Sequence, residues 1–269
     1  MKKLYIPLIL LAACIFSCSS PKVKEKPNEE AFATDSVTYR QVTKVAEVEL
    51  KADFPVSGNN ILTNAIQEFI SEELGGTYTG DLKAGKTLIN YYGNLLYKDL
   101  EDDAKEFDIN DLPTLNYSQD IKKIFETEKY ITYLSDTYIY MGGAHGMSTK
   151  QGSTFRKSDG RRFSYEMLFD TETSEFKKLL KKGLIEYFSD NEFAITNDDE
   201  LAAMLITESD VNNLPLPEYA PYLTNEGVTF IYQQYEIAPY AAGMPRFTIP
   251  YSDIKGFMTT TAKNYIENQ

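Results

Sequence analysis

The chain contains few of the residues that enzymes most often use for catalysis or metal binding. Its 269 residues include no tryptophan, one histidine and two cysteines, and both cysteines lie within the first 18 residues. We therefore exclude disulfides, thiolate metal sites and cysteine nucleophiles from the body of the protein. A histidine-based metal site or general base would depend on His145 alone, whereas a zinc site needs three or four ligands.

Several short motifs that carry common chemistries are also missing. The sequence has no Gly-x-Ser-x-Gly nucleophile elbow, no Gly-x-x-x-x-Gly-Lys-Ser/Thr phosphate loop and no His-Glu-x-x-His zinc motif. Adjacent carboxylates occur at positions 72–73, 102–103 and 198–199, but such pairs arise readily in a chain with 40 acidic residues. We expect a protein that is not an enzyme and that holds neither a metal nor a cofactor.

A long apolar run occurs only near the N-terminus. Two lysines at positions 2–3 precede the apolar residues 4–16, a run shorter than the ~20 residues of a membrane span and typical of a signal peptide. The cysteines follow this run in a way that resembles the lipobox of bacterial lipoproteins. Cys18 stands where the apolar run ends, while Cys14 follows the better-matching Leu-Ala-Ala. We predict a signal peptide over residues 1–18, lipid attachment at Cys18 (Cys14 is the alternative), and an extracytoplasmic location in the bacterial cell envelope, in the periplasm or at the cell surface.

The charge balance is strongly acidic. Without Lys2 and Lys3 the chain has 25 basic and 40 acidic residues, a net charge of −15. Nucleic acid and anionic membrane surfaces are therefore poor partners for the folded part, and we expect contact with the membrane only through the N-terminal lipid. A cationic partner would be attracted by the long-range field.

Residues 19–35 are polar, include two prolines, and are expected to form a flexible tether. Residues 36–115 then read as a small unit with a strand over 42–54, where apolar residues alternate with polar ones, and helices over 60–74 and 86–105. The first helix has Asn59 or Asn60 as its cap and ends at a pair of glycines.

Residues 116–269 read as a second domain. Its expected strands cover 121–127, 129–140, 147–156, 228–235 and 247–250, and its expected helices cover 173–188 and 198–206. The predicted class is α+β, in which the small strand–helix–helix unit packs with a larger domain that carries helices on a mixed or antiparallel sheet.

Two loops contain the candidate binding residues. The first follows the strand that ends at Tyr140 and contains Gly142, Gly143 and His145. Glycine in such a loop allows a positive φ or a close backbone approach. We expect the His145 ring to hydrogen-bond backbone within the loop, with ligand binding as an alternative and catalysis as the least favoured role.

The second loop lies between the last two strands and contains small residues and tyrosines. Tyr235 and Tyr240 lie in it, and Tyr251 follows the last strand. Tyrosine offers a large contact area with a polar tip, and it is common at recognition surfaces. A tyrosine-rich core is the alternative interpretation.

Two segments resemble a known family. The first is Gly-Gly-Ala-His-Gly at 142–146, followed by a strand and the Asp-Gly turn at 159–160. The second is Glu-Gly-Val-Thr-Phe-Ile-Tyr at 226–232, followed by residues 235–243 and Ile-Pro-Tyr at 249–251. Together they look like the domain DUF3298, and the unit before them resembles DUF4163, its usual partner.

The resemblance implies an α+β fold in the envelope. In this family the two domains form the extracytoplasmic part of lysozyme-sensing anti-sigma factors, and they also accompany a peptidoglycan deacetylase domain. We expect neither a sigma-binding segment nor a deacetylase domain in this chain. The expected function is non-catalytic binding of a cationic protein such as lysozyme or of cell-wall fragments. The alternatives are a structural envelope component without a ligand and, less favoured, a hydrolase of peptidoglycan or glycan.

Overall fold

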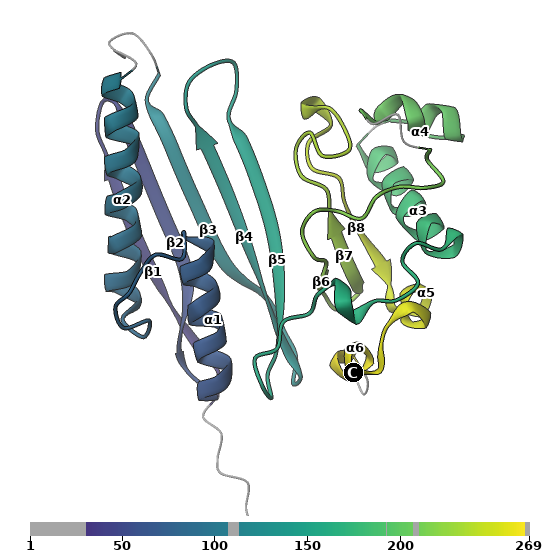
Figure 1. Ribbon diagram of the computed structural model, residues 1–269, viewed down its shortest axis with the longest axis horizontal. Helices are drawn as coiled ribbons and strands as arrows, with labels where there is room; N and C mark the ends of the chain where they lie inside the picture. The colour runs from purple at the N-terminus through teal and green to yellow at the C-terminus, as the bar shows by residue number, and fades with distance from the viewer. Residues whose placement is uncertain (1–30, 107–112, 192, 207–209, 267–269) are drawn as a thin grey trace, which may run out of the picture.

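A computed structural model describes residues 31–106, 113–191, 193–206 and 210–266. The predicted α+β class is confirmed, because the described residues form a five-stranded sheet, a three-stranded sheet and short and long helices (Figure 1). The predicted signal peptide, both cysteines and most of the predicted tether lie outside the described residues. None of the helices in the described ranges is both long and apolar enough to span a membrane.

The large sheet has the strand order β1-β2-β3-β4-β5. Strands β2 and β3 pair in parallel, and the other neighbours pair antiparallel. Its strands are β1 (Ala33–Val42), β2 (Ala46–Ser57), β3 (Leu115–Glu126), β4 (Tyr130–Tyr140) and β5 (Met147–Arg156).

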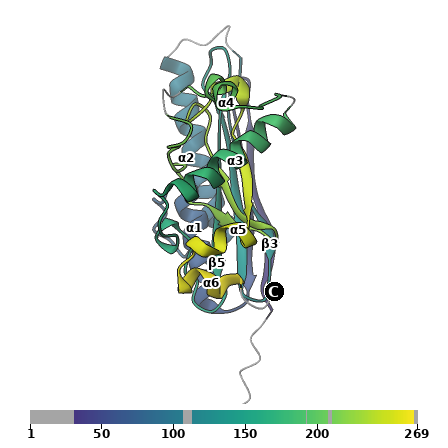
Figure 2. The same cartoon turned by 90° about the vertical axis from the view of Figure 1, so that its right-hand side faces the viewer.

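Helices α1 (Asn60–Glu73) and α2 (Gly85–Glu106) lie on the same side of this sheet (Figure 2). The alternation predicted for the first strand explains their position, since Val48, Leu50 and Phe54 of β2 are at most 2% exposed and face the helices. The predicted cap of α1 is also present: the Asn59 side chain accepts a hydrogen bond of 2.8 Å from the backbone N–H of Ile61.

The small sheet has the order β6-β7-β8, with β6 (Tyr222–Leu223), β7 (Gly227–Ile231) and β8 (Arg246–Pro250). Helix α3 (Ser174–Asp190) packs on it through an apolar stripe, and a second core forms between them. Gly183 of α3 permits this close packing, because a Cβ atom there would lie 2.0 Å from the ring of Phe247. The remaining helical segments are α4 (Asp198–Met204), α5 (Tyr251–Ile254), α6 (Thr260–Ile266) and the short 3-10 turns η1 (Tyr165–Met167), η2 (Tyr240–Ala242) and η3 (Lys255–Phe257).

The two sheets meet along β5. The backbone N–H of Leu223 donates to the hydroxyl of Thr154 at 2.9 Å, and the hydroxyl of Thr132 donates to the carbonyl of Leu223 at 2.8 Å. The ring of Tyr222 lies directly over Gly152, where a Cβ atom would be 2.1 Å from it. The side chains of Thr132 and Thr154 therefore join β4 and β5 to β6.

The division into sheets differs from the predicted division into domains. The predicted boundary between residues 115 and 116 falls at the start of β3, inside the large sheet, because β3 pairs in parallel with β2 from Ala46 to Ala52. The larger sheet thus belongs mainly to residues 33–156. Strand β1 also begins at Ala33, within the segment expected to be a tether.

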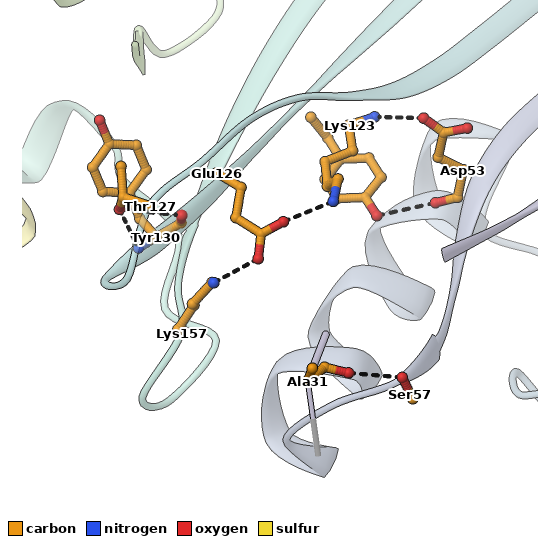
Figure 3. Close-up of polar contacts among 9 residues, drawn as sticks. Ala31, Asp53, Ser57, Lys123, Glu126, Thr127, Tyr130 and Lys157 are labelled. Carbon is orange, nitrogen blue, oxygen red and sulfur yellow. Dashed lines mark hydrogen bonds and ion pairs between the residues drawn. The ribbon is translucent and has the colours of Figure 1, made fainter. Parts of the chain in front are cut away.

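Polar contacts bind the end of the large sheet at which the chain enters (Figure 3). The Ser57 hydroxyl donates to the carbonyl of Ala31 at 2.8 Å. Glu126 accepts from Lys123 at 2.7 Å and from Lys157 at 2.6 Å, which ties the β3–β4 turn to the turn after β5. Burial raises the pKa of the Glu126 carboxyl, but the two lysines outweigh burial and the net pKa is lowered.

Candidate functional site

The two candidate loops lie at the end of the molecule opposite the point of chain entry. Ala33 pairs with Ser57 at one end of β2, while Ala46 at the other end pairs with Leu115. The next residue of β3 pairs with Tyr140, after which the glycine loop begins. A strand of 12 residues such as β2 spans about 40 Å at ~3.3 Å per residue. The loops therefore lie about that far from the N-terminal segment (Figure 1).

The glycine loop, residues 141–147, is bent and held by two tyrosines of β4. Gly142 and Gly143 have φ values of +90° and +91°, a region that other residues rarely adopt. The Tyr140 hydroxyl donates to the carbonyl of Gly143 at 2.9 Å. Gly146 packs under the ring of Tyr138, which a Cβ atom would approach to 2.4 Å. These contacts leave His145 exposed at the tip.

The tyrosine loop, residues 232–245, is attached to β5 by glutamine side chains. Gln233 accepts from the backbone N–H of Lys150 at 2.9 Å and donates to the carbonyl of the same residue at 2.9 Å. Gln234 accepts from the backbone N–H of Ser148 at 2.7 Å. The two amides therefore occupy part of the outer edge of β5 and fix this loop beside the glycine loop.

Within the tyrosine loop, Glu236 stabilises a tight turn. Its carboxylate accepts backbone hydrogen bonds of 2.6 Å from Gln233 and 2.6 Å from Glu218. Burial raises the pKa of the Glu236 carboxyl, and the two backbone donors offset only part of this effect. Tyr235 has a φ of +64°, which is strained for a residue with a side chain, and its side chain is 47% exposed. This backbone conformation directs Tyr235 toward the glycine loop.

His145, Tyr235 and Tyr240 form one aromatic cluster between the loops. The rings of His145 and Tyr240 stack at 3.9 Å between centroids with an interplanar angle of 22°. His145 Nε2 lies 3.2 Å from the Tyr235 hydroxyl, and the two tyrosine rings lie 5.7 Å apart. Because His145 and Tyr235 are exposed, Tyr240 is half-buried and the backbone is held from both sides, the cluster offers a preformed aromatic surface with polar tips.

The hydrogen bonds of His145 place a proton on one ring nitrogen. Nδ1 lies 3.0 Å from the carbonyl oxygen of Gly146, which can only accept, so Nδ1 carries a proton, while Nε2 contacts the Tyr235 hydroxyl, which can donate or accept. The predicted bond between the ring and the loop backbone is thus present. In the described ranges, the ring contacts no carboxylate, which is the partner that orients a catalytic histidine. The same ranges contain no group of three or more His, Cys, Asp or Glu side chains placed to hold a metal ion.

The structure brings together six of the seven residues expected to form a binding site: Tyr140, Gly142, Gly143, His145, Tyr235 and Tyr240. Tyr251 is separate. It follows Pro250, which pairs with Gly227 at the far end of the small sheet. There its hydroxyl donates to the carbonyl of Thr224 at 2.8 Å and lies 3.3 Å from the Tyr130 hydroxyl. Tyr251 thus fits the alternative interpretation, a tyrosine of the core with a satisfied hydroxyl.

Sequence reasoning missed the residues that position the cluster. Gln233, Gln234 and Glu236 hold the tyrosine loop through backbone groups, and the Tyr187 hydroxyl of α3 donates to the carbonyl of Ala242 at 2.7 Å. No pattern in the sequence marks these residues, because each acts on a backbone group that is distant in the chain or hidden in a turn.

Two family models match separate parts of the chain. Residues 166–252 match the family described as "Protein of unknown function (DUF3298)", which confirms the DUF3298 domain. Residues 40–148 match a family described as "Deacetylase PdaC", while the resemblance to DUF4163 stays a prediction. The aromatic cluster joins the two matched segments, since His145 lies in one and both tyrosines lie in the other.

Two crystal structures share the fold. A member of the DUF3298 family from Bacteroides fragilis is 20% identical with a TM-score of 0.66, over 87% of this chain and 96% of that one. A DUF3298 family protein from Pseudomonas aeruginosa is 16% identical with a TM-score of 0.53, over 88% of this chain and 97% of that one. A search of curated proteins found no match. At these identities the likeness concerns the fold.

Proposed function

We propose that this chain, which carries a DUF3298 domain, is a lipid-anchored binding protein of the bacterial cell envelope that recognises a cationic protein such as lysozyme without catalysing a reaction. The observation that supports this most strongly is the position of the aromatic cluster. It lies about 40 Å from the end at which the chain enters the fold. An anchor at Cys18 would hold the entry end near the membrane and present the cluster away from it.

The chemistry of the cluster and the charge of the chain both fit such a partner. Exposed tyrosines provide contact area at a small cost in side-chain entropy, and they are enriched among residues that dominate binding energy. A net charge of −15 after removal of the signal peptide would attract a cation. Cell-wall fragments are the alternative ligand, because tyrosine and histidine side chains can also pack on and hydrogen-bond to sugars.

A catalytic role is the competing proposal, and the family described as "Deacetylase PdaC" gives it a definite form. His145 is the only histidine of the chain, and its ring nitrogens contact a backbone carbonyl and a tyrosine hydroxyl. That arrangement suits a surface that binds a partner better than an acid–base pair. We expect no release of acetate from N-acetylated chitooligosaccharides, and acetate released at a rate that depends on protein concentration would favour the deacetylase.

Calorimetric titration with lysozyme tests the proposal directly. It should be carried out at low salt and at about 0.15 M salt, where charges more than ~8 Å apart are largely screened. We expect binding that survives the higher salt, and a loss of about fivefold or more in affinity for Tyr235→Ala and for Tyr240→Ala.

Tyr97→Ala is the matched control, because this tyrosine of α2 lies outside the loops and its hydroxyl donates to the Thr43 hydroxyl at 3.2 Å. Binding that disappears at the higher salt would reflect net charge alone. If lysozyme does not bind, peptidoglycan fragments are the next ligands to titrate, and a failure of both would favour a structural role.

A further inference from the structure

Strand β8 forms the free edge of the small sheet. It pairs with β7 on one side, and in Figure 1 it is the strand of this sheet that lies farthest from β5. Beyond Ile231↔Arg246 the ladder continues with a hydrogen bond of 2.9 Å from the N–H of Tyr232 to the carbonyl of Pro245. This bond sets the alternation of the antiparallel ladder.

The alternation identifies which backbone groups of β8 point outward. Phe247 and Ile249 occupy the hydrogen-bonded positions opposite β7, since they lie two and four residues after Pro245. Arg246 and Thr248 therefore direct their N–H and C=O groups to the outer edge. Within the described part of the chain, neither residue receives a backbone partner on that side. Such an edge is a template for a further strand.

A groove runs along this edge between β8 and α3. We call it the α3–β8 groove. It consists of a hollow of about 660 Å³ and a smaller hollow next to it. The two share Glu186 and Thr248, and together they border the whole of β8. On the α3 side they are lined by Leu179, Lys182, Gly183, Glu186, Tyr187, Asp190 and Asn191. An added strand would place alternate side chains toward this helix.

The charges of the groove favour a basic occupant. Its lining includes four carboxylates, those of Glu186, Asp190, Glu226 and Asp253. It also includes three cations, those of Lys150, Lys182 and Arg246. Lys150 pairs with Asp136 outside the groove at 2.8 Å. Lys182 lies 3.8 Å from Glu186 and 3.9 Å from Asp253, so the remaining pairing is loose. Side chains of an added strand that face α3 would therefore gain from being lysine or arginine.

We infer that the α3–β8 groove binds an extended segment of a partner protein, which adds to the small sheet as a fourth strand and directs basic side chains toward α3. Backbone hydrogen bonds to Arg246 and Thr248 would supply affinity, and the α3 carboxylates would supply selectivity. This inference rests on the proposed function, because it takes the partner to be a cationic protein. It uses a different surface from the aromatic cluster, so the two can fail separately.

The probe is an acetylated and amidated nonapeptide in which lysine alternates with threonine, compared with the same peptide carrying glutamate for lysine. We expect the lysine peptide to bind, and hydrogen exchange of the purified protein to slow at the amides of Arg246 and Thr248. In the free protein these two amides should exchange faster than those of Phe247 and Ile249. Failure of the lysine peptide to bind, or slower exchange elsewhere only, would overturn the inference.

Two variants of Thr248 separate the backbone contact from other effects. Thr248→Pro removes the outward N–H, and proline is tolerated at such an edge position. Thr248→Val keeps the N–H but, like proline, loses the hydroxyl contact of 2.8 Å with Thr229. We expect Thr248→Pro to bind the lysine peptide about tenfold or more weakly than Thr248→Val. Equal affinities would contradict strand addition.

The contribution of the α3 carboxylates can be tested separately, even if the proline variant fails to fold. The double variant Glu186→Gln with Asp190→Asn should reduce the preference for the lysine peptide over the glutamate peptide by about tenfold. An unchanged preference would overturn the assignment of the α3 carboxylates. Dimerisation of the protein through β8, seen by sedimentation and excluding the peptide, would assign the groove to a second copy of this chain instead.

Discussion

A double-mutant cycle on His145 and Tyr240 tests whether the two loops stabilise each other. The rings stack at 3.9 Å, and an aromatic pair of this kind contributes about 0.5–1.5 kcal/mol beyond burial. Both loops border solvent, so the lower half of this range applies. His145→Ala also removes the contacts to Gly146 and Tyr235, each worth about 0.5–1 kcal/mol at such a site.

The expected cost of His145→Ala is therefore about 1.5–3 kcal/mol in the free energy of unfolding. At about 2–4 °C per kcal/mol for a protein of this size, the melting temperature should fall by roughly 3–12 °C. Urea denaturation of the wild type, both single variants and the double variant gives the coupling energy. We expect about 0.5–1 kcal/mol between His145 and Tyr240.

A matched cycle between His145 and Tyr97 should be additive, because Tyr97 lies on α2 and bonds to Thr43 instead. Additivity in both cycles would refute the view that the stacked pair joins the loops. A coupling of several kcal/mol would also contradict it, because contacts between exposed rings cannot supply that much.

Three further predictions concern the frame that carries the loops. Gly183→Ala should destabilise the protein by about 1–2 kcal/mol, since its Cβ would lie 2.0 Å from the Phe247 ring, whereas Gly256→Ala, with no atom within 4 Å of its Cβ, should be nearly neutral in urea denaturation. The pKa of Glu126 is lowered in the fold, so its ionised carboxylate stabilises the wild type above the unfolded-state pKa, and this stability is lost in acid. Glu126→Gln should therefore reduce the difference in the free energy of unfolding between pH 7 and pH 3. An unchanged difference would speak against this. Glu73 has the opposite sign, since burial raises the pKa of its carboxyl more than Ser135 and Arg162 lower it. Its ionisation costs stability as the pH rises from the unfolded-state pKa to the folded one, so Glu73→Gln should remove that decline when urea denaturation is followed across this pH range.

The sequence predicted the helices better than the strands, for a local reason. The apolar stripe of α1, its Asn59 cap and the glycines after it all lie within one stretch of chain, so they could be read together. Helix α3 followed in the same way, with Thr173 as its cap. The short helices α5 and α6 were not expected, because they have few residues in which a helical period can show.

Strand limits depended on partners that the sequence does not reveal. The predicted strand over 42–54 begins later, at Ala46, because Thr43 closes a turn by donating its N–H to the carbonyl of Ala46 at 2.8 Å. Strand β1 was not predicted, because an edge strand is largely exposed and the polar residues at its start resemble a tether. The strand predicted over 228–235 ends at Ile231, where Gln233 and Gln234 turn to bind β5 instead.

The candidate site shows the same limit. Its aromatic residues could be chosen from composition and loop position, but nothing local indicates that His145 meets residues about 90 positions later. That contact depends on parallel pairing of β2 with β3 and on the join along β5. Both are long-range features, and only the folded chain shows them.

The most direct test of the account is a hydrogen-exchange footprint of the purified protein with lysozyme at about 0.15 M salt, where long-range attraction is screened. We predict that lysozyme slows exchange in residues 141–147 and 232–245 and leaves the amides of α2 unchanged. Binding that protects other surfaces, or no protection at saturating lysozyme, would contradict the claim that the His145–Tyr235–Tyr240 cluster recognises a cationic protein.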